Sequence, residues 1–334
     1  MQNVGSQSTP VRFGIRRAAL ILGALIIGLA LAGAIYENIS EARDRRFNPM
    51  PGRLVNVAGR KMHIYCVGSG SPTVILDAGL GDTYVSWREV QAPIGKFTRV
   101  CSYDRAGSGY SEPSSQPRTS RVIAEELHAL LQAASIAPPY ILAGHSMGGY
   151  NVRLYASLYP SDVAGVVFVD SSHPDQESLF PPELKNMEGS WKREAEFLAY
   201  TTPLGIPRLI GLCDQIPLQR AAECNWHSAR EGMEELNRFS ESAAQAGATP
   251  SFGDMPLAVL SHDPAKPSGD LPPDLSKATN DVWDKLQEEM VHLSTRGTRT
   301  IAKNSGHYIQ IDRPDAVIDA LRKMVEQIRP VPAA

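Results

Sequence analysis

An apolar run that stops at a cluster of small residues, and is followed by a helical segment, constrains the fold of this chain more than any other feature. The run is residues 140–143, and the cluster is Gly144-His145-Ser146-Met147-Gly148. These five residues fit the pattern G-x-S-x-G in the strand–turn–helix context that the pattern requires. A serine hydroxyl is a weak nucleophile, so it must be held on a tight turn close to a base and to oxyanion donors. The stretch therefore predicts a buried strand, a sharp turn that presents Ser146, and a helix over residues 150–158.

The N-terminal region contains an uncharged apolar run, residues 18–36, preceded by Arg12, Arg16 and Arg17. In a helix, a run of 19 residues spans about 28 Å, which is close to the thickness of the bilayer hydrocarbon core. We therefore expect a transmembrane helix or signal anchor at 18–36, with residues 1–17 in the cytoplasm because the arginines lie there.

A secretory signal that is cleaved is the alternative, because Ala32-Gly33-Ala34 resembles an A-x-A cleavage site. The first interpretation gives a membrane-anchored protein with an extracytoplasmic body, and the second a secreted or periplasmic one. Residues 37–52 are polar and charged, and we interpret them as a tether.

Cysteine usage fits an oxidising compartment, since the chain has four cysteines. Cys213 and Cys224 could close a short loop. Cys66 and Cys101 fall in two expected strands, where they are either a disulfide or ordinary buried thiols. No C-x-x-C pair or metal-like spacing of Cys and His occurs, so we expect no metal site. A net charge of −3, with 21% charged residues among 334, argues against a nucleic-acid partner.

From residue 53 onward, short apolar strands alternate with helical segments, which is typical of an α/β architecture with a mostly parallel sheet. The alternation stops after a strand at 163–169 and resumes near residue 255. We therefore predict a core of residues 53–170 and 255–334, interrupted by an insertion at 171–254. Helices are expected over residues 87–97, 120–134, 150–158, 231–245, 280–294 and 314–327.

Four motifs in chain order resemble those of the α/β-hydrolase fold superfamily, and the resemblance covers residue 53 to the C-terminus. They are Asp77-Ala78-Gly79-Leu80-Gly81, the loop that starts at Asp104 and ends at Ser111, the turn at Ser146, and Asn304-Ser305-Gly306-His307. Ala78 replaces the histidine usual in the first motif. The resemblance implies a mostly parallel eight-stranded sheet with helices on both faces and a helical cap insertion. The loop at Asp104 supports the fold and not catalysis.

The resemblance also implies a set of catalytic residues. Ser146 would be the nucleophile and His307 the base, while the backbone amides of Leu80 and Met147 would form the oxyanion hole. The acid is Asp170, at the end of the sixth strand, or alternatively Asp263, just after the seventh. The position of Asp170 in the sequence agrees with the spacing that the family pattern expects, whereas Asp263 comes earlier than the pattern expects. We therefore predict Asp170.

A serine esterase or lipase that acts on a small, apolar acyl substrate without a cofactor is the function that the resemblance implies. Other chemistry on the same fold (haloperoxidase, lyase or acyltransferase) and a membrane-tethered binding protein without turnover are the alternatives. The substrate, its acyl chain length and the oligomeric state stay open. The apolar residues of the insertion are expected to line the substrate pocket or to pack the core of the cap; they are Trp191, Phe197, Leu198, Leu204, Leu209 and Ile210.

Overall fold

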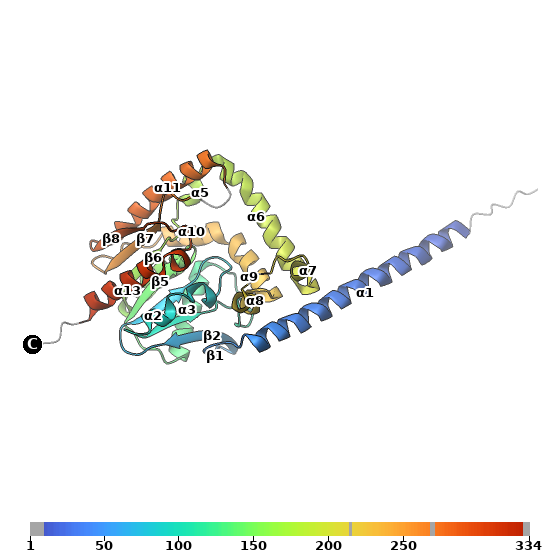
Figure 1. The fold of residues 1–334 in the computed structure, drawn as a ribbon, viewed down its shortest axis with the longest axis horizontal. Helices are drawn as coiled ribbons and strands as arrows, with labels where there is room; N and C mark the ends of the chain where they lie inside the picture. The colour runs from blue at the N-terminus through green and yellow to red at the C-terminus, as the bar shows by residue number, and fades with distance from the viewer. Residues whose placement is uncertain (1–9, 214–215, 268–270, 330–334) are drawn as a thin grey trace, which may run out of the picture.

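The chain folds around one eight-stranded sheet (Figure 1), as seen in a computed structural model that describes residues 10–213, 216–267 and 271–329. Residues 1–9, which belong to the expected cytoplasmic segment 1–17, lie outside the described residues, as do parts of the expected insertion and core. The strands are β1 (Arg53–Val57), β2 (Arg60–Val67), β3 (Thr73–Asp77), β4 (Val100–Tyr103), β5 (Tyr140–His145), β6 (Val163–Val169), β7 (Leu257–His262) and β8 (Gly297–Ala302).

The strand order is β1-β2-β4-β3-β5-β6-β7-β8. Only the pairs β1–β2 and β2–β4 are antiparallel, and every later pair is parallel. The predicted eight-stranded, mostly parallel sheet is therefore confirmed. In such a sheet the carboxyl ends of β3, β5, β6, β7 and β8 lie along one edge, which is where parallel α/β folds place their ligands.

Helices cover both faces of the sheet. Alternate strand residues such as Ile75, Leu142 and Phe168 form one apolar cluster with α3 and α4. Their neighbours, such as Leu76 and Val167, form a second cluster with α2 and α13 on the opposite face. The central strands are apolar on both sides for this reason, as buried parallel strands are. The helices are α1 (Pro10–Phe47), α2 (Gln91–Ile94), α3 (Ser120–Ala133), α4 (Gly148–Leu158), α5 (Gln176–Leu179), α6 (Pro182–Thr201), α7 (Ile206–Leu209), α8 (Pro217–Glu223), α9 (Trp226–Asn237), α10 (Phe239–Gly247), α11 (Pro273–Val291), α12 (Ile309–Asp312) and α13 (Pro314–Ile328), with the 3-10 helices η1 (Tyr84–Trp87), η2 (Pro160–Asp162) and η3 (Thr202–Leu204).

Three predicted helices are wrong in their extent. The helix expected over 280–294 is α11, which begins earlier, at Pro273, because a proline is tolerated in the first turn, and ends at Val291. The helix expected over 87–97 is replaced by η1 and the short α2, because Pro93 is tolerated only in the first turn of a helix. The helix expected over 231–245 is two helices, α9 and α10, with a turn at Arg238. This turn directs Phe239 against the ring of Tyr150 in α4, with the ring centroids 5.5 Å apart.

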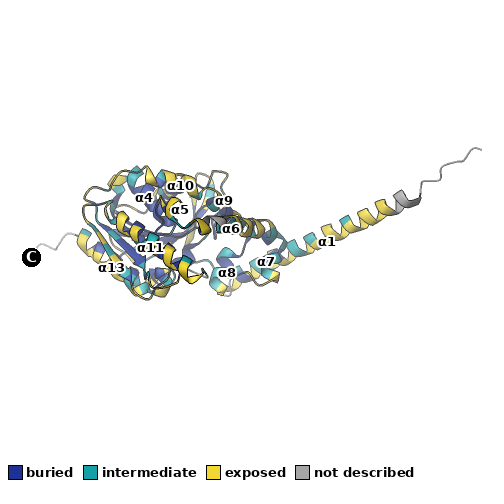
Figure 2. Cartoon of the chain, turned by 90° about the horizontal axis from the view of Figure 1, so that it is seen from above, coloured by how far each residue is buried: buried dark blue, intermediate teal, exposed yellow. Residues whose placement is uncertain are grey.

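Helices α5 to α10 all lie between β6 and β7 in sequence and form a cap beside the sheet (Figure 1). Helix α1 projects from the body on the side of α6, α7 and α8, and its residues 15–29 are almost all exposed (Figure 2). Within the described residues, α1 is the one helix long and apolar enough to cross a membrane. It continues unbroken to Phe47, so most of the expected tether, residues 37–52, is helical.

All four cysteines are paired. Cys66 and Cys101 face each other in the register of β2 and β4 and form one disulfide, and Cys213 and Cys224 form the other within the cap. Cross-links of this kind are typical of exported proteins, because the cytoplasm keeps thiols reduced.

Candidate active site

The turn between β5 and α4 holds Ser146 in a left-handed backbone conformation, with φ of 50°. Neighbouring glycines allow this tight turn. A Cβ atom at Gly144 would lie 2.4 Å from the carbonyl oxygen of Gly148, and one at Gly148 would lie 2.5 Å from that of Asp77. Non-glycine residues adopt this conformation only where the surrounding structure enforces it, and such positions cluster at functional sites. Ser146 is partly exposed, and within the described ranges its hydroxyl makes no hydrogen bond to protein.

The loop after β3 passes directly against this turn. A Cβ atom at Gly148 would also lie 2.6 Å from the carbonyl oxygen of Ala78. Met147 is the N-cap residue of α4, so its amide lies at a helix N-terminus, where backbone N–H groups favour negative charge. Among residues 10–213, 216–267 and 271–329, the amides of Leu80 and Met147 donate to no protein acceptor. Both amides are therefore available to an oxygen atom of a ligand.

His307, in the loop after β8, contacts Asp170 at the end of β6. The distance from His307 Nδ1 to Asp170 Oδ2 is 2.6 Å, although the residues lie 137 positions apart. The side chain of His307 is 40% exposed, whereas that of Asp170 is fully buried. A buried carboxylate on Nδ1 fixes the imidazole tautomer and leaves Nε2 free to exchange a proton.

Asp170 accepts hydrogen bonds from several other donors. Its Oδ1 accepts from the backbone amide of His262 and from Nε1 of Trp283, each at 2.9 Å. Nδ1 of His262 also lies 2.9 Å from Oδ2. Burial alone would raise the pKa of Asp170, but the contacts with His262 and His307 hold the pKa of this carboxyl well below its usual range. Asp170 is therefore ionised at neutral pH.

Asp263 has a different environment. Its carboxylate accepts from the backbone amides of Asn304 at 3.0 Å and Ala265 at 3.1 Å, and Lys303 lies 3.7 Å away. These contacts, that with Asn304 foremost, lower the pKa of Asp263. The side chain thus holds the start of the loop that carries His307 and contacts backbone rather than the imidazole.

His145 supports the loop that carries His307. Its Nε2 donates to the carbonyl oxygen of His307 at 3.0 Å, and the two rings lie 4.7 Å apart. Burial, with the nearby His307 as a second cause, lowers the pKa of His145 to about 3. His145 is therefore neutral at physiological pH and acts as a structural donor.

A buried ion pair ties the loop after β3 to the cap, and the sequence patterns did not predict it. Arg105, in the loop after β4, donates to the carbonyl oxygens of Ala78 at 2.9 Å and Gly79 at 2.6 Å. Its Nε lies 2.5 Å from Oε1 of Glu235 in α9, and Oε2 of Glu235 accepts from the amide of Gly81 at 2.8 Å. Glu235 and Arg105 thus hold the loop that carries Leu80 from both sides.

The role of His262 also fell outside the sequence prediction, whereas the supporting role of the Asp104 loop was predicted. His262 had no distinctive sequence context, and its position at the end of β7 was the one signal available. The Asp104 loop does brace the fold, since Asp104 accepts from the amides of Tyr84 at 2.9 Å and Tyr110 at 3.0 Å. Its neighbour Arg105 gives the loop a second role at the site.

An apolar pocket of about 490 Å³ is lined by residues of the cap together with Leu80 of the loop after β3. Of the cap residues expected in the pocket or in the core of the cap, the pocket contains Trp191, whereas Phe197, Leu209 and Ile210 are exposed at the surface. Leu80 belongs to the lining, which joins the pocket to the loop beside Ser146. The principal apolar lining residues are Leu80, Phe180, Leu184, Trp191, Leu236 and Phe239.

No group of three or more His, Cys, Asp or Glu side chains within the described ranges is arranged to hold a metal ion. The polar groups at the site are instead a hydroxyl, imidazoles, a carboxylate and free backbone amides. This set is suited to proton transfer and to stabilising an oxyanion, without a metal ligand sphere.

Comparisons with known proteins agree with this architecture. Residues 72–206 match the family model described as alpha/beta hydrolase fold. The Bacillus subtilis proteins YbdG and YqjL are 30% identical over 158 residues and 28% identical over 251 residues, respectively. The first alignment covers 46% of this chain and 48% of YbdG, and the second 75% of this chain and 82% of YqjL. The chain thus spans about half the length of the first of these relatives.

A solved structure of a thermophilic esterase from Thermogutta terrifontis has a similar fold. The TM-score is 0.58, with 19% sequence identity, over 83% of this chain and 99% of the esterase. At this identity the likeness concerns the fold.

Proposed function

Because the chain belongs to the α/β-hydrolase fold superfamily, we propose that it is a serine hydrolase that cleaves a carboxylic ester through Ser146, His307 and Asp170. The 2.6 Å contact between His307 and the buried Asp170 is the observation that carries the proposal. Asp263 is the weaker candidate for the acid, since its carboxylate is engaged by backbone amides. The esterase named above lends support through its fold, and fold alone does not choose a substrate.

In the proposed mechanism, Nε2 of His307 takes the proton from the hydroxyl of Ser146 as the oxygen attacks the ester carbonyl. The amides of Leu80 and Met147 donate to the resulting oxyanion. His307 then passes its proton to the leaving alcohol, which departs and leaves an acyl-enzyme. A water molecule, deprotonated by His307, hydrolyses this intermediate and restores Ser146.

The carboxylate of Asp170 keeps the proton of His307 on Nδ1 and stabilises the imidazolium that forms in each half-reaction. A pKa held below its usual range keeps Asp170 ionised throughout, so no proton passes to it. The apolar lining of the 490 Å³ pocket favours an apolar acyl chain over a charged one.

We also propose that residues 18–36 anchor the protein in a membrane with the catalytic body outside the cytoplasm. The body would comprise the core, 53–170 and 255–334, and the cap, 171–254. Continuity of α1 through Ala34, and the packing of Gly33 against Leu204, favour an uncleaved anchor over a removed signal. The two disulfides fit this location.

Covalent labelling tests the proposed function. A fluorophosphonate probe should label the full-length protein on the peptide that contains Ser146, and p-nitrophenyl esters should be hydrolysed. Absence of label and turnover would favour a binding protein without catalysis. Analysis of products with water and with alcohol acceptors separates a hydrolase from an acyltransferase, because only the latter transfers the acyl group preferentially to the alcohol.

Replacing Glu235 should impair the oxyanion loop from the cap side. Glu235→Gln removes the charge that pairs with buried Arg105, so we expect a loss of stability of about 3 kcal/mol. We also expect a kcat about tenfold lower, because a misplaced oxyanion donor stabilises the transition state less. Urea unfolding and the hydrolysis of p-nitrophenyl butyrate would measure the two effects.

Glu234→Gln is the matched control, since it makes the same chemical change one position earlier on α9, away from the pair between Arg105 and Glu235. Glu235→Gln behaving like this control in both assays would contradict a role for the ion pair.

A further inference from the structure

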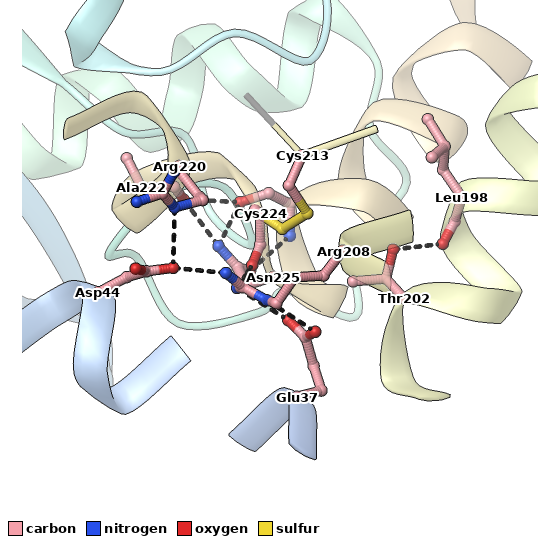
Figure 3. Close-up of a disulfide and its surroundings, with 11 residues drawn as sticks. Glu37, Asp44, Leu198, Thr202, Arg208, Cys213, Arg220, Ala222, Cys224 and Asn225 are labelled. Atoms are coloured by element: carbon pink, nitrogen blue, oxygen red, sulfur yellow. Dashed lines mark hydrogen bonds and ion pairs between the residues drawn. A yellow bond between two sulfur atoms is a disulfide. The ribbon is translucent and has the colours of Figure 1, made fainter. Parts of the chain in front are cut away.

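A buried cluster of charges joins α1 to the cap (Figure 3). Arg208 of α7 donates to the carboxylate of Glu37 at 3.1 and 3.2 Å and to that of Asp44 at 2.5 Å. Arg220 of α8 lies 3.2 Å from Asp44. The side chains of Glu37, Asp44 and Arg208 are 4%, 7% and 9% exposed. The cap, rather than the sheet, is therefore the part of the body to which α1 is attached.

A second contact lies one helical turn closer to the N-terminus. A Cβ atom at Gly33 would lie 2.3 Å from the carbonyl oxygen of Leu204, so the backbones of α1 and η3 touch there. Gly33 belongs to the apolar run 18–36 and lies about 4.5 Å, measured along the helix, from the end of that run. When the run spans a bilayer, this part of the cap reaches slightly into it.

The cap surface beside this junction is apolar and exposed. Its residues are between 40% exposed, for Phe197, and 70% exposed, for Tyr200. Both views of the molecule place α6 and α7 on the side from which α1 projects (Figures 1 and 2). Exposed apolar residues gathered in one place mark an interaction surface. We call this surface the rim; it consists of Phe197, Tyr200, Leu209, Ile210 and Leu212.

A bilayer is the partner that fits the position of the rim. Arg208 contacts α1 and immediately precedes Leu209 and Ile210. The apolar residues of the rim therefore lie next to the apolar surface of α1. Helix α6 also exposes the charged residues Arg193 and Glu194, and charged side chains are expected at the level of the lipid headgroups. Apolar side chains below that level, with a tyrosine among them, are typical of a protein surface that lies in the membrane interface.

The apolar pocket is lined in part by the same helix. Leu184 and Trp191 of α6 line it, Trp191 is 45% exposed, and Leu80 of the oxyanion loop lies in the lining as well. Helix α6 thus carries residues of both the rim and the pocket. An acyl chain held at the rim would lie beside the same helix that lines the pocket.

We propose that the rim lies in the bilayer beside α1 and that the substrate is an acyl ester held in the membrane. The first part concerns a surface and is independent of catalysis, and the second rests on the proposed function of Ser146. The tests distinguish this proposal from two others. In one, a water-soluble ester reaches the pocket from solution; in the other, the rim binds a protein partner.

Photolabelling tests the position of the rim. Full-length protein is reconstituted into vesicles of phosphatidylethanolamine and phosphatidylglycerol that carry a lipid with a diazirine in its acyl chain. After illumination, labelled peptides are mapped by mass spectrometry. We expect label in the run 18–36 and in residues 197–212, and none near Leu54, an exposed leucine of β1. Label confined to α1 would overturn the proposal.

Turnover of two esters tests the substrate class. The variant Leu209→Asp/Ile210→Asp should hydrolyse p-nitrophenyl palmitate in the same vesicles about tenfold more slowly than the wild type, because charged side chains oppose interfacial burial. Its hydrolysis of p-nitrophenyl butyrate in solution should not change, and Leu54→Asp, a charge added at another exposed leucine, should change neither rate.

Equal loss on both esters, or preference of the wild type for butyrate in solution, would overturn the membrane-held substrate. Failure of the wild type to hydrolyse either ester, without fluorophosphonate label on Ser146, would instead refute the proposed function. The photolabelling result would still decide the position of the rim in that case.

Discussion

Ser146→Ala should lower kcat for p-nitrophenyl butyrate by about 10⁴- to 10⁶-fold, the range seen when a serine nucleophile is removed from a triad. Without the hydroxyl no acyl-enzyme forms, so the burst of p-nitrophenol that precedes steady turnover should also vanish. Steady-state and stopped-flow assays on the same protein sample would measure both effects.

The variant should keep its fold, because the Ser146 hydroxyl makes no hydrogen bond to protein within the described ranges. We expect the free energy of unfolding to change by less than about 1 kcal/mol. Substrate binding should survive, so KM or the affinity for a non-hydrolysable analogue should change little. Turnover that persists in a well-folded Ser146→Ala protein would contradict the assignment of Ser146 as the nucleophile.

Asp170→Asn should lower kcat by about 10⁴-fold, since an amide at this position favours the wrong tautomer of His307, the proposed base. Asp263→Asn is the matched control and should leave kcat close to that of the wild type, because its carboxylate contacts the backbone amides of Asn304 and Ala265. A large loss in Asp263→Asn, with Asp170→Asn active, would reverse the assignment of the acid.

Asp170→Asn should also be less stable, and the loss should depend on pH. The folded state lowers the pKa of Asp170, so its ionised form contributes stability above the unfolded pKa of about 3.9. That contribution is lost as the pH falls through the folded value. We expect the variant to be about 3 kcal/mol less stable than the wild type at pH near 7.

The difference between the two proteins should shrink at pH below about 4, where Asp170 of the unfolded wild-type chain begins to bind a proton while the folded carboxylate is still ionised. Urea midpoints at neutral and acidic pH would measure this trend. A difference that stays constant over the whole range would mean that the loss comes from packing against Trp283 and not from the charge.

The sheet could be predicted from the sequence because its strands are short, apolar and separated by clear turn residues. Each predicted site residue follows such a strand, so the parallel arrangement alone brings Ser146, His307 and Asp170 to one edge. The choice between Asp170 and Asp263 needed more, since both follow adjacent strands. Side-chain direction decides which contacts His307, and spacing along the chain does not determine it.

Contacts between distant parts of the chain were beyond the sequence patterns. Arg105 and Glu235 are 130 positions apart, and no sequence motif predicts that they form a pair. Short helices posed a further problem. Leu209 and Ile210 are apolar and were expected in the pocket or in the core of the cap, but a helix of one turn has no periodicity from which to tell its buried face from its exposed face.

The attachment of α1 to the cap also determines where the chain can be shortened. Cutting ahead of β1, at residue 52, would remove Glu37 and Asp44 and expose the surfaces of η3 and α8 that α1 covers. Cutting just before Tyr36 would remove nearly all of the apolar run and keep both carboxylates on Arg208. A form of this protein without its apolar run should therefore begin within α1, at the part that packs on the cap, and not at the first strand of the sheet.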